Sequence, residues 1–181
     1  MIFFLRHQAT YNNKFGLISG QADSPILRDN IYLENSDVLK TIDAVYSSPS
    51  QRCLDTLQLI SELDLSPTID IRLLERKMGV FENCDRKDLY RKFPSFFRNI
   101  NGQVYFQLKL TPPGGESYLE FAQRISSFCS EVIEQNINRN ILICSHNQAM
   151  KLIYCMLKGI KPSDEIWSKI NFPNGKIVTD P

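Results

Sequence analysis

The sequence contains two histidines, one tryptophan and no long apolar segment. None of its apolar stretches approaches the roughly 20 residues that an α-helix needs to span a bilayer. The apolar start at Met1 runs directly into Arg6 and His7, whereas an export signal would begin with basic residues and continue with a longer apolar stretch. We therefore expect a cytoplasmic protein that does not associate with a membrane.

The cysteines are odd in number, widely spaced and free of any C-x-x-C pair. They are Cys53, Cys84, Cys129, Cys144 and Cys155. This pattern argues against a disulfide framework and against a structural zinc site, and it favours a reducing compartment. Cys144 lies next to Ser145 and His146, which would suit a thiol nucleophile. Because it follows three apolar residues, we instead expect it to be buried in a strand.

Neither sign of charge is in excess, because 21 basic residues face 20 acidic ones and the net charge is +1. This balance removes the general electrostatic attraction to nucleic acid or to an anionic membrane surface. Any site for an anion must therefore be local. The 181 residues can bury one substantial core, so we predict a single domain over residues 1–181.

Short runs of β-branched and aromatic residues predict buried parallel strands over residues 2–5, 43–47 and 141–144. Apolar residues at helical spacing predict helices between and after them, over residues 51–63, 117–135 and 150–157. This alternation predicts an α/β fold, a three-layer α/β/α sandwich around a mostly parallel central sheet.

Two other regions have a different character. Residues 76–113 are rich in charge, aromatic residues and proline, which predicts a helical and loop insertion that covers a site. Its aromatic side chains either form a wall of a substrate pocket or pack as a core. Near the end of the chain, a turn at 173–175 followed by residues 176–179 predicts an edge strand.

Both histidines lie at the ends of predicted buried strands. In open α/β sheets, ligands bind beyond the carboxyl ends of the strands, so His7 and His146 are expected to face one crevice. The alternative is that each is an ordinary core or surface histidine. Arg6 and Arg52 follow strand ends too, and a guanidinium matches phosphate oxygens and stays charged, so the two favour a phosphate site. The alternative for each arginine is a surface salt bridge.

Several segments share a pattern with one known family. Residues 5–13, L-R-H-Q-A-T-Y-N-N, resemble the R-H-G-x-T-x-x-N signature of the histidine phosphatase superfamily (phosphoglycerate mutase-like, branch 1). Later landmarks follow in the family's order: G-Q-A-D-S-P at 20–25, S-S-P-S-Q-R-C-L-D-T at 47–56, L-E at 74–75, G-E-S at 115–117 and C-S-H-N at 144–147. The resemblance covers nearly the whole chain.

The resemblance implies a role for each matching residue. His7 would be the nucleophile that forms a phosphohistidine, and Glu75 would be the general acid and base. Glu82 is the alternative for that carboxylate role. Catalytic stabilisation of the phosphoryl oxygens would come from Arg6, Arg52 and His146. Further phosphate contacts are expected from Asn13, Gln21 and Asn147.

The sequence departs from the family at two positions in the predicted pocket. Gln8 follows His7 and Asn147 follows His146, where the family usually has glycine. Glycine lets the backbone and the substrate approach closely, so these amide side chains are expected to narrow the site, to add hydrogen bonds or to displace a residue needed for catalysis.

We therefore predict a metal-independent histidine acid phosphatase-type phosphomonoesterase that acts on a small phosphorylated metabolite and uses no cofactor. Two alternatives remain open: phosphoryl transfer of the phosphoglycerate mutase type, and a non-catalytic phosphate-binding or interaction module. A metal site built on the histidines is disfavoured because the arginines would repel a cation. A monomer and a homodimer agree equally well with the composition.

Overall fold

The computed structural model describes residues 1–28, 36–60, 66–179 and 181. A central sheet runs through the described part of the chain, with strand order β3-β2-β6-β1-β7. Its strands are β1 (Ile2–Arg6), β2 (Ala44–Ser47), β3 (Thr68–Ile69), β6 (Ile141–Ser145) and β7 (Ile177–Val178). All neighbours pair in parallel except β7, which is antiparallel to β1 at the edge. The mostly parallel sheet and the edge strand near the chain's end are thus confirmed.

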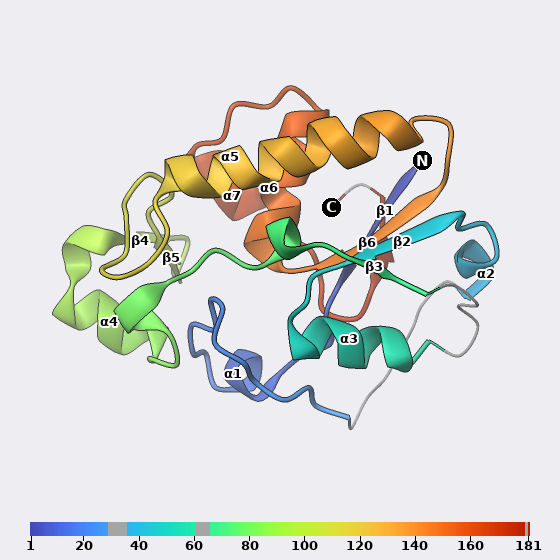
Figure 1. Ribbon diagram of the computed structural model, residues 1–181. Coiled ribbons are helices and arrows are strands. Elements are labelled where there is room, and N and C mark those ends of the chain that lie inside the picture. The colour runs from blue at the N-terminus through green and yellow to red at the C-terminus, as the bar shows by residue number, and fades with distance from the viewer. Residues whose placement is uncertain (29–35, 61–65, 180) are drawn as a thin grey trace.

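Helices cover both faces of this sheet (Figure 1). One face is covered by α5 (Tyr118–Phe128), its continuation through a π-helical turn (Cys129–Ile133), α6 (Asn147–Leu157) and α7 (Asp164–Lys169). The other face is covered by α2 (Ser36–Leu39) and α3 (Gln51–Gln58). The predicted three-layer α/β/α sandwich is the observed architecture.

The alternation of side chains along the central strands explains why both faces are covered. Phe4 and Ile143 pack in the core beneath α5 and α6, whereas Phe3, Leu5 and Leu142 pack in the core beneath α2 and α3. Successive side chains of a strand point to opposite faces, so a strand that is apolar throughout needs helices on both sides. Cys144 is fully buried in β6, as expected.

The predicted insertion at 76–113 contains more regular structure than the sequence indicated. It holds a helix, as predicted, α4 (Arg86–Lys92). It also holds a hairpin of β4 (Phe97–Ile100) and β5 (Gln103–Phe106), and this hairpin was not predicted. The turn between these strands is Asn101-Gly102, and both residues have positive φ. An Asn-Gly pair is the usual signal for such a two-residue turn.

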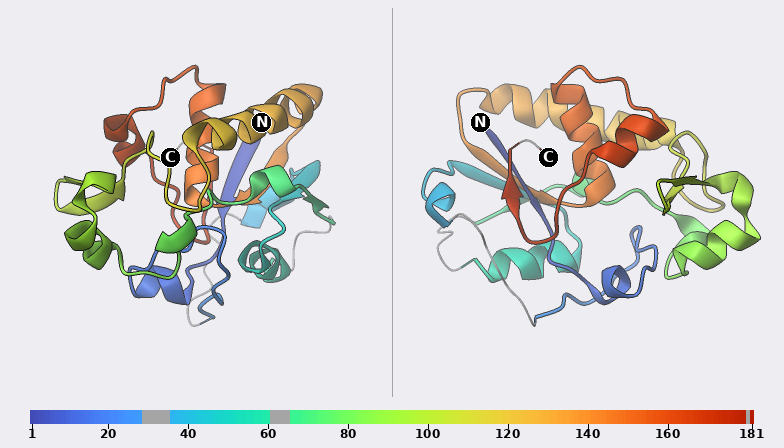
Figure 2. Two further views of the ribbon diagram at one scale, coloured as in Figure 1. Left: turned by 60° about the vertical axis from the view of Figure 1, so that its left-hand side comes forward. Right: turned by 180° about the vertical axis from the view of Figure 1, so that it is seen from behind.

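The aromatic residues of this region form a core of their own. The ring of Phe81 lies 5.4 to 6.1 Å from the rings of Phe93, Phe96, Phe97 and Phe106. The resulting lobe lies beyond one end of the sheet in every view (Figures 1 and 2). Core packing is therefore the role of most of these aromatics.

The helix boundaries differ from those predicted. The helix expected over 51–63 ends at Gln58, and residues 61–63 lie outside the described residues. The helix expected from residue 150 begins at Asn147. Short helices also occur at α1 (Tyr11–Lys14) and in 3-10 turns at Ile71–Leu73, Gly79–Phe81, Pro94–Phe96 and Glu134–Asn136. No helix in the described ranges is long and apolar enough to cross a membrane.

The G-E-S segment has a structural explanation. Ser117 is the N-cap of α5: its side chain accepts a hydrogen bond from the Glu120 backbone amide, and the Glu120 carboxylate accepts one from the Ser117 backbone amide. Glu116 forms an ion pair with Arg124 at 2.6 Å. This capping box satisfies orphan amides at the start of the helix.

Ser117→Ala should therefore lower the free energy of unfolding by about 1 kcal/mol, the usual effect of losing an N-cap side chain. Urea denaturation provides the measurement, with Ser126→Ala on the exposed side of the same helix as the control. A variant that keeps its stability but loses affinity for substrate would instead assign Ser117 to substrate contact.

Candidate active site

The site forms where two neighbouring strands end. Arg6 of β1 is in register with Ser145 of β6, and the backbone amide of His7 donates to the carbonyl oxygen of Ser145 at 3.1 Å. The next residues along each strand are therefore side by side, and the rings of His7 and His146 lie 5.2 Å apart between centroids. The structure brings the two histidines together as the sequence predicted.

His7 is held through one of its ring nitrogens. Its Nδ1 donates to the carbonyl oxygen of Gln8 at 2.7 Å, because a carbonyl can only accept. This bond fixes the tautomer that leaves Nε2 with a free lone pair. Burial, followed by the nearby charges of Arg52 and Arg6, lowers the pKa of His7 well below 6.5. The imidazole is thus neutral and nucleophilic at physiological pH.

A small cavity of about 90 Å³ lies in front of His7. Most of its polar lining comes from residues that the sequence had indicated. The lining residues are Arg6, His7, Asn13, Leu17, Ile18, Ser19, Gly20, Arg52, Glu75, Arg86, Asn147 and Gln148. The pocket therefore contains an imidazole, a carboxylate and three guanidinium groups.

Arg52 is buried at the back of this inner cavity, with 1% of its surface exposed. Its Nη1 and Nη2 donate to the carbonyl oxygens of Ala22 and Gly20, and its Nε donates to Nδ1 of His146 at 3.2 Å. These bonds fix the guanidinium and tie the loop around Gly20 to the strand ends. A surface salt bridge, the alternative for Arg52, is excluded by this burial.

His146 is placed behind Arg52 and does not line the inner cavity. Because its Nδ1 accepts from Arg52, its Nε2 carries the proton and faces the hydroxyl oxygen of Ser48 at 2.9 Å. Burial lowers the pKa of His146 well below 6.5, with further lowering from Arg52 and His7. In this arrangement His146 orients Arg52, and its direct contact with phosphate stays a prediction.

The two candidate carboxylates are in different places. Glu75 lines the inner cavity, where its Oε1 and Oε2 accept from the backbone amides of Arg76 and Gln148. Glu82 accepts from the backbone amides of Gln21, Ala22 and Met78 and does not line the cavity. Of the two candidates, Glu75 is therefore the one that lies on the wall of the cavity beside His7.

The remaining predicted phosphate contacts divide in the same way. Asn13 and Asn147 line the inner cavity. Gln21 does not, because its side-chain amide donates to the carbonyl oxygen of Glu75 at 3.1 Å. Gln21 thus supports the backbone of the carboxylate residue, and its contact with phosphate is untested.

The two replacements of family glycines have different consequences. Gln8 is buried and does not line the inner cavity. Its side chain packs against Gly175 so closely that a Cβ added at Gly175 would lie 2.4 Å from Nε2 of Gln8. The expectation that Gln8 narrows the pocket is therefore wrong. Asn147 does line the cavity, and its Oδ1 accepts from the backbone amide of Phe172 at 3.3 Å, which orients its NH₂ group away from that bond.

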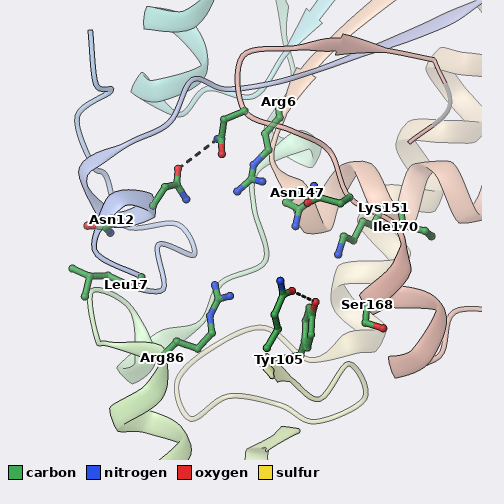
Figure 3. A pocket seen from close by; sticks show the side chains of 14 residues that line it. Arg6, Asn12, Leu17, Arg86, Tyr105, Asn147, Lys151, Ser168 and Ile170 are labelled. Atoms are coloured by element: carbon green, nitrogen blue, oxygen red, sulfur yellow. Dashed lines mark hydrogen bonds between the residues drawn. The ribbon is translucent and has the colours of Figure 1, made fainter. Parts of the chain in front are cut away.

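A larger cavity of about 550 Å³ adjoins the inner one. Arg6, Asn13 and Asn147 line both, and the outer cavity adds side chains that we had not predicted, above all Lys151 and Tyr105 (Figure 3). Arg86 lines both cavities and was also missed. Lys151 had a signal in the sequence, since it is a lone charge within the apolar run of α6.

Charged side chains in this region do not form a metal centre. No group of three or more histidine, cysteine, aspartate or glutamate side chains that could hold a metal ion occurs among the residues the structure describes. The cavity walls instead carry arginine and lysine, which suit an anion.

These features place a neutral histidine, a carboxylate and three guanidinium groups around one cavity. The pattern of the Histidine phosphatase superfamily (branch 1) matches residues 2–179, so the chain belongs to this family. A relative from Hydrogenobacter thermophilus, named "Putative phosphoserine phosphatase 2", is 30% identical over 98% of this chain and 87% of its own length. The Escherichia coli adenosylcobalamin/alpha-ribazole phosphatase is 28% identical over 92% and 82% of the two chains.

A solved structure agrees as well. The crystal structure of the alpha-ribazole phosphatase from Shigella flexneri matches with a TM-score of 0.73 and 25% identity, over 97% of this chain and 87% of that one. The relatives named here are phosphatases, which supports a hydrolase.

The buried histidines should make the protein sensitive to acid. Both have a pKa well below 6.5 in the fold, so below about pH 6.5 the unfolded chain binds protons that the native protein does not. The free energy of unfolding should therefore have its full value above this pH. As the pH is lowered further it should decrease, by up to about 1.4 kcal/mol per pH unit for each histidine.

Urea denaturation between pH 7.5 and 5 measures this slope. The chain has two histidines, so a double variant, His7→Gln with His146→Gln, removes all histidine titration and should show a shallower slope than wild type. Equal slopes in the two proteins would mean that the histidines do not hold the predicted low pKa values.

Proposed function

We propose that the protein hydrolyses a phosphate monoester of a small metabolite through a phosphohistidine on His7, without a metal ion. The observation that carries this proposal is the free Nε2 of a neutral His7 beside an inner cavity that also presents Arg6, Arg52 and Glu75. The named phosphatases among the relatives support the hydrolytic reaction.

In the first step, Nε2 of His7 attacks phosphorus and the bond from phosphorus to the ester oxygen breaks. The carboxyl group of Glu75 gives its proton to that departing oxygen, so the leaving group departs as an alcohol. Arg6 and Arg52 balance the charge on the equatorial oxygens throughout the transfer. The burial that lowers the pKa of Arg6 to about 10 leaves it charged at neutral pH.

In the second step, the Glu75 carboxylate takes a proton from water and the resulting hydroxide attacks phosphorus. The bond between phosphorus and Nε2 breaks, phosphate leaves, and His7 is again neutral. Two backbone amides already donate to the Glu75 side chain, which keeps it at the cavity wall between the two steps.

Phosphate release from 4-nitrophenyl phosphate, with a metal chelator present, tests the proposal. Wild type should turn over, and His7→Ala should reduce release to background because the nucleophile is missing. If phosphate instead moves to an added alcohol and none reaches solution, the mutase alternative is correct. If wild type binds vanadate but releases no phosphate, the protein is a binding module.

The carboxylate assignment has its own test. Glu75→Gln should lower kcat about 10²-fold to 10⁴-fold, the usual contribution of a positioned general acid or base. Glu134→Gln, an exposed glutamate in the turn after α5, is the matched control. An unchanged kcat in Glu75→Gln would show that another group transfers the proton.

A further inference from the structure

The outer cavity contains positive charge beyond what one phosphoryl group requires. Arg52 lines only the inner cavity, Arg6 and Arg86 line both, and Lys151 lines the outer cavity alone. In the described part of the chain, no aspartate or glutamate lines the outer cavity. If Arg6 and Arg52 hold the transferred phosphoryl group, Arg86 and Lys151 share the outer cavity with no carboxylate among its described lining residues.

Lys151 is a built feature of this cavity. It projects from the middle of α6, five residues after His146, and only 4% of its surface is exposed. Its Nζ donates to the carbonyl oxygen of Trp167 at 2.7 Å, which uses one of three donors. Burial lowers the pKa of Lys151 to about 8, and the charge of Arg6 adds to the effect. A lysine is seldom buried unless an acceptor or an anion compensates for lost hydration.

Arg6 and Arg86 also have interactions that the described part of the protein does not satisfy. Nε of Arg6 is buried and has no hydrogen-bond partner there. Among the described residues, it is the one buried side-chain nitrogen or oxygen atom in this state. Arg86 forms no ion pair among the described residues. Arg6 reaches the cavity from the end of β1 and Lys151 from α6, and Arg86 reaches it from the opposite wall (Figure 3).

We propose that the substrate's leaving group bears a second anionic group, a carboxylate or a phosphate, held by Arg86 and Lys151, and that it bears no ammonium group. This inference rests on the proposed function and names its substrate class. An anion in the outer cavity would balance the charge of both cations and would compensate the buried Lys151 for its lost hydration.

The exclusion of an ammonium group follows from the same lining. An ammonium in the outer cavity would face Lys151 and Arg86 and find no carboxylate there. Glu75 lines the inner cavity and already accepts hydrogen bonds from two backbone amides. A phosphorylated hydroxy acid or a bisphosphate therefore fits better than a phosphorylated amino acid.

Three esters with the same carbon skeleton test this proposal. Glycerol 3-phosphate has a neutral leaving group, 3-phosphoglycerate adds a carboxylate, and O-phosphoserine adds both a carboxylate and an ammonium. We expect kcat/KM for 3-phosphoglycerate to exceed that for each of the other two by about tenfold or more, the effect of one charged hydrogen bond. Comparing kcat/KM for fructose 1,6-bisphosphate with kcat/KM for fructose 6-phosphate tests whether a phosphate can serve as the second anionic group.

Two variants assign the effect to its residues. Lys151→Met and Arg86→Gln should each reduce the preference for the dianionic ester to within a few-fold of unity, whereas Lys161→Met, which removes an exposed lysine, should retain it. Arg86 is exposed at the cavity, so its variant remains informative if the buried Lys151 variant fails to fold. Equal rates for the three esters, a preference for O-phosphoserine, or a preference that persists in both variants would overturn the proposal.

Binding separates this inference from the proposed function. Calorimetry on His7→Ala gives the Kd of each ester without turnover. The anion site is supported if His7→Ala binds 3-phosphoglycerate more tightly than glycerol 3-phosphate. If, in addition, wild type hydrolyses neither ester nor 4-nitrophenyl phosphate, the phosphatase proposal is refuted while the anion site stands. Hydrolysis by wild type with equal Kd values would do the reverse.

Discussion

The parallel pairing of β1 with β6 is the constraint on which the rest of the site depends. Because Arg6 and Ser145 are in register, the residues that follow them leave the sheet at the same edge and the two histidine rings come within 5.2 Å. The pairing lies in the middle of the sheet, with helices covering both faces. A shift of one residue would exchange the two faces of a strand, so the cores that fix the register also fix the distance between the histidines.

The buried cations are stabilised mainly by backbone oxygens and little by carboxylates. Arg52 donates to two carbonyls, and Arg76 donates to the carbonyls of Leu108, Leu110 and Glu116. Carbonyl dipoles solvate a guanidinium without cancelling its charge, so the pocket keeps a positive potential before any ligand binds. Burial, together with the charges of Arg52 and Arg6, lowers the pKa of His7 and keeps its imidazole neutral. The charges that favour an anion in the pocket therefore also help to keep the imidazole of His7 neutral.

The sequence predicted the layers and the strand-end histidines because both follow from local patterns, a period of two in the strands and a helical period between them. It did not indicate the β4–β5 hairpin, although Asn101-Gly102 was a usable turn signal. Nor did it indicate that Gln8 turns away from the pocket, because that depends on Gly175, which is 167 positions later in the chain. Arg86 reaches the cavity through the fold of its lobe, which no local pattern reveals. Lys151 is different: a single charge in an apolar helix was visible in the sequence alone.

The central claim is that His7 carries the phosphoryl group between the two steps. Rapid mixing of the protein with 4-nitrophenyl phosphate, an alkaline quench and mass spectrometry of the peptides measure this directly, since a phosphohistidine survives alkali and is lost in acid. The account predicts one added phosphoryl group on the peptide that contains His7, formed within a single turnover and absent from His7→Ala. Phosphate release by wild type with no phosphorylated histidine, or with the group on another residue, would contradict it.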